Sequence, residues 1–189
     1  MLRKIIAAIC ICSLPVAAHA GFMESVKSKI SSTAHASDGS GTAKISVYFS
    51  PNGGCTDAVV SEIGKAKKEV LVQAYSFTSA PIAKALVEAH KRGVDVIAVL
   101  DKSQRTEKYT GATFLKNAAI PVFIDAKHAI MHNKVMIIDG KTIITGSFNF
   151  TSSAEKRNAE NLLVINDDPA LVKTYISNFK LHRGHSEAY

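Results

Sequence analysis

Cysteine is scarce in this sequence, and its three copies stand where they cannot form a disulfide framework. Cys10 and Cys12 lie in an apolar stretch near the N-terminus, and Cys55 is the third. If processing removes the apolar stretch, a single thiol is left, which excludes a fold held together by intrachain disulfides. We therefore expect Cys55 to be a small buried residue of the core.

Tryptophan is absent, and no apolar run after residue 20 is long enough to cross a bilayer, which takes about 20 residues. The first 20 residues differ, because Arg3 and Lys4 precede the apolar run IIAAICICSLPVAA and an Ala-His-Ala triplet ends at Ala20. This pattern predicts a signal peptide at residues 1–20 and a mature chain exported to the bacterial periplasm or secreted, without stable membrane insertion. An uncleaved N-terminal anchor is the alternative.

The rest of the chain fits one domain. Residues 21–43 are rich in Ser, Ala, Gly and Thr, which predicts a flexible linker. Residues 44–189 alternate strand patterns with helix patterns, which predicts an α/β fold with a mixed β-sheet sandwiched between helices. The expected strands are 45–50, 70–77, 94–101, 121–125 and 161–165, with a hairpin at 132–149 and helices at 57–67, 81–92, 107–117 and 169–182.

The run HNKVMIIDGKTIITGSFN, residues 132–149, concentrates reactive side chains. With a two-residue Asp-Gly turn at its centre, an antiparallel hairpin would place His132 opposite Ser147 and Lys134 opposite Thr145. Because side chains alternate along a strand, these four would share one face of the sheet. An imidazole, an ammonium and two hydroxyl groups would then converge on one place.

These groups suit phosphoryl transfer. A neutral imidazole can attack phosphorus, an ammonium can hold phosphoryl oxygens, and hydroxyl groups and the Asn149 amide can donate hydrogen bonds to the charge that develops. The alternative is a buried hairpin of an ordinary α/β protein, whose His and Lys simply lie at its exposed mouth. That alternative leaves the convergence of four kinds of polar group unexplained.

The pattern HxKxxxxD with GSxN downstream resembles the phospholipase D superfamily. The segment YSFTSAPIAKALVEAHKRGVDV is similar to the short, single-motif bacterial endonucleases of that superfamily, and the resemblance extends from about Ile45 to the C-terminus. It implies a phospholipase D-like catalytic domain at residues 44–189. It also implies a phosphodiesterase that needs no metal and no other cofactor.

The resemblance implies a role for each polar residue of the motif. His132 would become transiently phosphorylated, Lys134 and Asn149 would bind the phosphate, and Ser147 would support the site. Glu160 matches the downstream acid that holds the histidine ring, where a carboxylate would fix the tautomer and stabilise the imidazolium. A solvated charge at a helix end is the alternative for Glu160.

Two residues of the motif are expected to be structural. Asp139 sits at the far end of the hairpin from His132, so we assign it to the turn and to an ion pair. Gly146 is likewise assigned to the structure of the motif and not to the chemistry.

One chain supplies one HxK motif, while the implied mechanism needs one histidine to attack and a second to protonate the leaving oxygen. The short family members that the chain resembles pair two protomers about a two-fold axis through the active site. The resemblance therefore implies a homodimer in which each subunit contributes His132 to a shared site.

The other histidines give no sign of a metal site. His90, His182 and His185 are expected at the surface. His128 and His132 have HxxxH spacing, but on an extended chain they would lie roughly 13 Å apart, at about 3.3 Å per residue, which is too far for one ion. We therefore expect no metal.

Charge favours a polyanionic partner. Removing Arg3 and Lys4 from the 23 basic residues leaves 21 against 16 acidic ones, a net charge of +5 for the mature chain. Lys156 and Arg157 follow the GSFN segment closely and are the best candidate nucleic-acid contacts. Tyr75 and Phe77 end a strand that is expected to point at the site.

The resemblance implies an endonuclease that hydrolyses DNA, with RNA as a second candidate. Because no base-reading motif is present, we expect it to cut without sequence preference. The alternatives are a phospholipase D acting on phospholipid head groups and, from another class, a non-catalytic nucleic-acid-binding accessory protein.

Overall fold

The computed structural model describes residues 43–106 and 110–189. The predicted signal peptide and all of the predicted linker except Ala43 lie outside these ranges. The elements are β1 (Lys44–Ser50), α2 (Cys55–Lys65), β2 (Glu69–Ala74), α3 (Ala80–Lys91), β3 (Asp95–Asp101), the 3₁₀ helix η2 (Lys102–Arg105), α4 (Gly111–Asn117), β4 (Val122–Asp125), β5 (Lys134–Ile138), β6 (Thr142–Gly146), α5 (Ser152–Lys156), β7 (Glu160–Asn166), α6 (Pro169–His185) and β8 (Glu187–Ala188).

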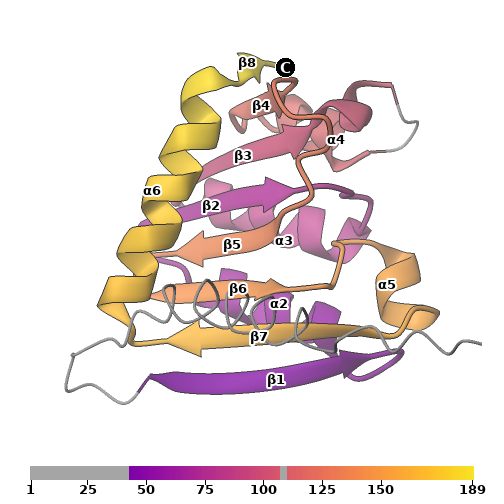
Figure 1. Ribbon diagram of the computed structural model, residues 1–189, viewed down its shortest axis with the longest axis vertical. Helices are drawn as coiled ribbons and strands as arrows, with labels where there is room; N and C mark the ends of the chain where they lie inside the picture. The colour runs from indigo at the N-terminus through magenta and orange to yellow at the C-terminus, as the bar shows by residue number, and fades with distance from the viewer. Residues whose placement is uncertain (1–42, 107–109) are drawn as a thin grey trace, which may run out of the picture. The chain divides into compact units, whose positions relative to one another are not determined.

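The strands form one eight-stranded sheet in the order β1-β7-β6-β5-β2-β3-β4-β8 (Figure 1). β2, β3 and β4 run parallel, and all other neighbouring pairs are antiparallel. The parallel strands are joined through helices, as parallel neighbours require. The predicted mixed sheet is therefore confirmed.

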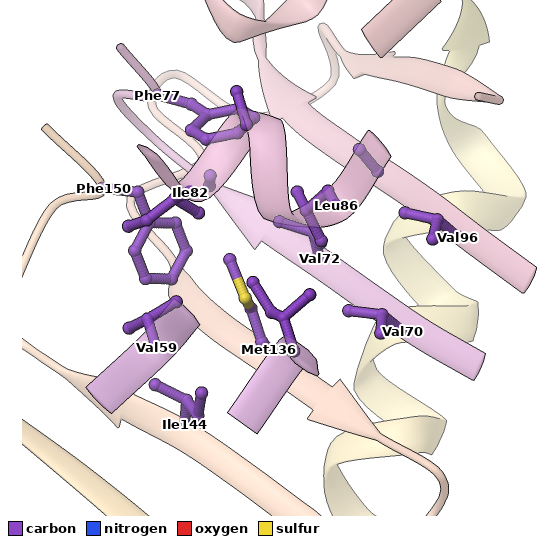
Figure 2. Close-up of a cluster of buried hydrophobic side chains, with 14 of the residues drawn as sticks. Val59, Val70, Val72, Phe77, Ile82, Leu86, Val96, Met136, Ile144 and Phe150 are labelled. Carbon is purple, nitrogen blue, oxygen red and sulfur yellow. The ribbon is translucent and has the colours of Figure 1, made fainter. Parts of the chain in front are cut away.

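Helices cover both faces of this sheet. α2 and α3 lie on one face and α6 crosses the other (Figure 1). Side chains alternate along β5, so Met136 packs with Val59 of α2 and Leu86 of α3 in one core (Figure 2). Ile137 points the opposite way and belongs to a second core with Phe179 of α6. This confirms the expected sandwich. No helix in the described ranges is long and apolar enough to span a membrane.

Local signals set the ends of several helices. Pro81 lies in the first turn of α3, where its missing N–H is not needed, and Gly93 follows the helix with φ +88°. The Asp168 side chain accepts a hydrogen bond from the backbone N–H of Leu171 at 2.9 Å and caps α6.

Three short elements were not predicted, namely η2, α5 and β8. α5 has only five residues, and it begins where Thr151 Oγ1 accepts a hydrogen bond from the backbone N–H of Ala154 at 3.1 Å. The helix expected at 107–117 begins at Gly111 in the described part, and residues 107–109 lie outside it.

The register of the β5–β6 hairpin differs from the prediction by one residue. Ile138 pairs with Thr142, so the tip has three residues, Asp139, Gly140 and Lys141, instead of two. Asp139 and Gly140 both have positive φ, +55° and +61°.

The observed register corrects two predicted neighbours. Continued along the hairpin, it brings Lys134 opposite Gly146 and turns Thr145 to the other face of the sheet, because successive side chains alternate. The expected pairings of His132 with Ser147 and of Lys134 with Thr145 are therefore wrong.

Candidate active site

A cavity of about 330 Å³ opens at the mouth of the hairpin. The segments that form it are the loop before β5, the start of β5, the end of β6, the following loop and the start of β7. Its lining is His132, Lys134, Gly146, Ser147, Asn149 and Glu160. The structure thus brings together the five residues that the sequence analysis assigned to catalysis, together with Gly146.

His132 and Lys134 are in direct contact. The Lys134 ammonium donates to the backbone carbonyl of His132 at 2.8 Å, and its Nζ lies 2.8 Å from Nδ1 and 3.1 Å from Nε2 of the same residue. Lys134 is buried, at 7 % exposure, whereas His132 is exposed. The cation is therefore anchored beneath an imidazole that faces solvent.

Tyr75 forms one side of this pair. Its ring centroid is 4.5 Å from that of His132, and Lys134 Nζ lies 5.2 Å from the Tyr75 centroid. The backbone N–H of Tyr75 donates to the carbonyl of Asn133 at 2.8 Å, which ties the end of β2 to the chain beside the imidazole. Sequence reasoning expected Tyr75 near the site and was right. It also expected Phe77 there, whereas Phe77 is fully buried against Phe150 in the core.

Gly146 allows β7 to pass very close to the end of β6. A Cβ at this position would lie 2.2 Å from the carbonyl oxygen of Asn161, and the backbone φ is +143°. The same carbonyl accepts hydrogen bonds from the N–H groups of Ser147 and Phe148 at 3.1 and 3.2 Å. Only glycine fits this crossing without moving the strands apart.

Ser147 and Asn149 each keep polar capacity for a ligand. Ser147 Oγ accepts a hydrogen bond from the N–H of Asn161 at 3.0 Å, so its own hydroxyl hydrogen is available to donate. Asn149 Oδ1 is buried and has no hydrogen-bond partner among the described residues. An amide oxygen only accepts hydrogen bonds, so the Nδ2 group is the part of the Asn149 side chain that can donate to a phosphoryl oxygen.

Glu160, the first residue of β7, also lines the cavity. Its Oε1 accepts from the Asn158 amide at 3.1 Å, and its backbone N–H donates to Ser50 Oγ at 3.1 Å. Within the described chain Glu160 makes no hydrogen bond to His132, whose ring contacts Lys134 and Tyr75 instead.

Comparison with known proteins places the chain in a family. The family model described as "Cardiolipin synthase, PLD-like domain" matches residues 59–183. A curated relative from Rickettsia conorii named "Phospholipase D" is 44 % identical over 137 residues, which cover 72 % of this chain and 68 % of the relative. The chain belongs to the phospholipase D superfamily. It is therefore an enzyme of the phosphodiesterase class.

Two further comparisons describe this phospholipase D-family chain. The solved structure of Nuc from Salmonella typhimurium, a phospholipase D family member, superimposes with a TM-score of 0.75 at 38 % identity, covering 78 % of this chain and 98 % of Nuc. A mitochondrial cardiolipin hydrolase of Xenopus tropicalis is 31 % identical over 116 residues, which are 61 % of this chain and 55 % of that protein. The Nuc match spans nearly the whole of a small family member.

The electrostatics of this phospholipase D-family site centre on Lys134. Burial lowers the pKa of its ammonium below the ordinary lysine value, and the negative charge of Glu160 raises the pKa and so partly opposes that effect. Glu160 therefore influences the cation although it forms no ion pair with it within the described residues.

Asp139 lies at the far end of the hairpin and takes no part in the cavity. Its carboxylate accepts hydrogen bonds from the backbone N–H groups of Lys67, Lys68 and Glu69 at 2.7 to 3.2 Å. The Asp139 carboxylate thus accepts backbone hydrogen bonds instead of forming the expected ion pair, because the loop between α2 and β2 turns its N–H groups toward the hairpin tip.

The candidate nucleic-acid contacts stand outside the cavity. Lys156 ends α5, Arg157 follows it, and both are exposed. Neither lines the cavity, and Arg157 donates to Ser153 Oγ at 2.7 Å. Neither side chain is therefore placed to bind a group inside the cavity.

Cys55, His182 and His185 lie away from the cavity, and their burial tests what the sequence predicts for them. Cys55 is fully buried, and burial, assisted by the charge of Glu155, raises the pKa of its thiol to about 11, so it is the inert core residue that was expected. His182 was expected at the surface but is buried at 9 % exposure, and His185 is half-buried. Both histidines turn toward Asp125.

Proposed function

We propose that this phosphodiesterase is an exported endonuclease that hydrolyses DNA, with RNA as a second substrate, through a phosphohistidine intermediate and without a catalytic metal. The observation that carries the proposal is the exposed imidazole of His132 beside the buried ammonium of Lys134, in a cavity that Asn149 also lines. Together these provide a nucleophile and two phosphate-binding groups in one cavity.

In the first step the neutral His132 ring attacks phosphorus, a nitrogen–phosphorus bond forms, and the bond to the leaving oxygen breaks. The leaving oxygen takes a proton from a second imidazolium. In the second step that imidazole removes a proton from water, and the hydroxide attacks phosphorus and releases His132. The atoms and charges of the hydrolysis balance without any further reactant.

The remaining residues act on the phosphoryl oxygens and on the ring. Lys134 neutralises the charge that develops on them, and the Ser147 hydroxyl and the Asn149 amide donate hydrogen bonds. Glu160 supports the charged form of Lys134, and we assign it the further role of orienting the imidazole once substrate is bound.

Glu160 gives this mechanism a pH signature. Since its charge raises the pKa of Lys134, Glu160→Gln should move the alkaline fall of kcat/KM to lower pH, because Lys134 then loses its proton earlier. The measurement is a pH profile with bis(4-nitrophenyl) phosphate. Glu62→Gln, the same change on α2 outside the cavity, should leave the profile in place. An unmoved alkaline limb in Glu160→Gln would contradict the electrostatic role.

The second imidazole is proposed to come from the partner of a homodimer. One chain places one HxK histidine in the cavity, and that histidine is exposed where a second subunit could approach it. A two-fold axis beside the cavity would set two copies of His132 on either side of one phosphate.

A mixed dimer tests the shared site. Wild-type and His132→Ala chains carrying different tags are co-expressed, and the species that carries both tags is isolated. We expect activity far below half of the wild-type value, because no phosphate in such a dimer meets two imidazoles. A dimer of two differently tagged wild-type chains is the control. Retention of about half the activity, as independent sites would give, overturns the proposal.

Nucleic acid is favoured as the substrate by the basic charge of the chain, by exposed Lys156 and Arg157 near the cavity, and by the match to nearly all of Nuc. Phosphate neutralisation by these cations would make binding salt-dependent. The sequence contains no base-reading motif, so we propose recognition of the backbone without sequence preference.

A phospholipid head group is the second candidate substrate. Curated relatives are named phospholipase D and mitochondrial cardiolipin hydrolase. Ile130, two residues before His132, is 58 % exposed and is apolar enough to touch a lipid surface.

The experiment that separates these substrates compares plasmid DNA, single-stranded RNA and vesicles of phosphatidylcholine or cardiolipin, each with and without EDTA. Nicking that persists in EDTA and vanishes in His132→Ala supports the endonuclease. Head-group release without nicking selects the phospholipase. Retardation of DNA without turnover of any substrate selects the binding protein.

The same experiment tests metal independence, since nicking that EDTA abolishes and Mg²⁺ restores would overturn it.

Export is tested separately by N-terminal sequencing of protein recovered from the periplasm, which should begin at Gly21.

A further inference from the structure

A second cluster of reactive side chains lies where the end of α6 meets the end of β4. Asp125 is the last residue of β4, His128 follows in the loop, and His182 and His185 lie in the last turn of α6. One ligand atom from each lies within 4.8 Å of all the others. None of the four lines the active-site cavity.

All three imidazoles point at one oxygen. Asp125 Oδ2 is 2.9 Å from His128 Nδ1, 2.7 Å from His182 Nδ1 and 3.1 Å from His185 Nε2. A carboxylate oxygen has about two lone-pair sites, so three donors exceed its capacity. The Asp125 side chain is also fully buried, which requires compensation of its charge.

The four donor atoms are close enough together to surround one metal ion, with 2.7 to 3.1 Å between Asp125 Oδ2 and each nitrogen and no more than 4.8 Å between any two of the four. Bonds of about 2.0–2.2 Å to nitrogen and carboxylate oxygen separate neighbouring donors by roughly 3.4 Å in a tetrahedron. His182 and His185 are three residues apart on a helix and so share one face. Asp125, at the end of β4, precedes His128 by the same three residues. A central cation would give each donor atom its own bond.

Backbone contacts already orient the carboxylate for this role. Asp125 Oδ1 accepts hydrogen bonds from the N–H groups of Lys127 and His128 at 3.1 and 3.3 Å. This holds Oδ1 in the loop and directs Oδ2 toward the imidazoles. Such outer contacts are typical of carboxylates that ligate metals.

We propose that Asp125, His128, His182 and His185 bind one Zn²⁺ ion in a closed, structural site. Three imidazole nitrogens and one carboxylate oxygen suit Zn²⁺, which is four-coordinate and tetrahedral in structural sites. Four protein ligands leave no open position for water, so the ion takes no part in the hydrolysis. The site therefore stands independently of the proposed endonuclease chemistry.

The ion would join the C-terminal helix to the loop that carries His132. His128 precedes His132 by four residues, and between them the N–H of Met131 donates to the buried carboxylate of Asp101 at 2.7 Å. With His128 held by the metal and Met131 by Asp101, the chain leading into His132 would be fixed at two points.

Metal content and thermal stability of the purified protein test this proposal. Protein stripped with a chelator and then given one equivalent of ZnCl₂ should retain about one zinc per chain after desalting. Its Tm should rise by about 5–10 °C, as expected when a tight ligand binds only the folded state of a domain of this size. His185→Gln should lose both the zinc and the rise in Tm.

His90→Gln is the matched control, because His90 lies on α3 outside the cluster and should leave uptake unchanged. If His185→Gln does not fold, Co²⁺ added to the stripped wild-type protein should give the intense visible bands of a tetrahedral site. Failure of the wild type to retain zinc, no Co²⁺ bands, or equal loss of zinc in His90→Gln overturns the proposal.

Discussion

Replacing His132 with alanine should lower the turnover of a phosphodiester by at least about 10⁴-fold, because loss of a covalent nucleophile removes the reaction path and not merely one contact. The exposed ring is the only nucleophile in the described cavity with a cation held beside it. The measurement is kcat with bis(4-nitrophenyl) phosphate, which does not depend on nucleic-acid binding.

Asn133→Ala serves as the control, since Asn133 contacts Tyr75 through its backbone carbonyl and its side chain does not line the cavity. Its turnover should stay close to that of the wild type. Circular dichroism of both variants establishes that they are folded. If folded His132→Ala keeps more than about a tenth of the wild-type turnover, His132 is not the nucleophile.

Replacing Asp139 with alanine should lower the free energy of unfolding by about 2–4 kcal/mol, because the backbone N–H groups of Lys67, Lys68 and Glu69 lose a charged acceptor. Urea unfolding measures the loss. Asp95→Ala, at an exposed position that begins β3, should change stability by no more than about 0.5 kcal/mol. Turnover of the folded Asp139→Ala protein should be nearly normal, and a large loss would place Asp139 in the chemistry.

The same carboxylate predicts a pH dependence. Burial would raise the pKa of Asp139, but hydrogen bonds from the backbone of Lys68, Glu69 and Lys67 outweigh it and lower the pKa below its ordinary value. A lowered pKa in the folded state means that the stabilisation is complete above the unfolded value of about 3.9 and is lost as pH falls through the folded value. The stability difference between the wild type and Asp139→Asn should therefore shrink below about pH 4. A constant difference down to pH 2 would contradict this linkage.

The sequence was informative about the active site because most of that site is local. His132, Lys134, Ser147 and Asn149 belong to a single hairpin, and hairpin geometry alone brings its two open ends together. The register was harder to predict, since an Asp-Gly pair with two positive φ values fits a two-residue tip, and Lys141 only becomes part of the tip once β2 and β7 pair on either side. The hydrogen bonds between Asp139 and the α2–β2 loop likewise join residues that are far apart in the sequence, so the spacing of residues within the hairpin does not predict them.

The cluster around Asp125 was missed for a related reason. The nearest histidine to His128 in the sequence is His132, whereas its partners on α6 lie more than fifty residues away. The sequence does contain a local signal for this cluster. Two pairs of possible metal ligands are each three residues apart, Asp125 with His128 and His182 with His185. The prediction that Phe77 points at the site is wrong because the strand ends at Ala74, and the chain then turns and directs the Phe77 ring into the core.

The three-residue tip of the β5–β6 hairpin should not tolerate insertions or deletions. Removing or adding one residue between Ile138 and Thr142 either strains the tip or slides one strand by a single step, which sends each of its side chains to the reverse side of the sheet. Substitutions at Gly140 or Lys141 leave that count intact. A randomised library of this tip should therefore yield functional clones of the native length and none that are one residue shorter or longer.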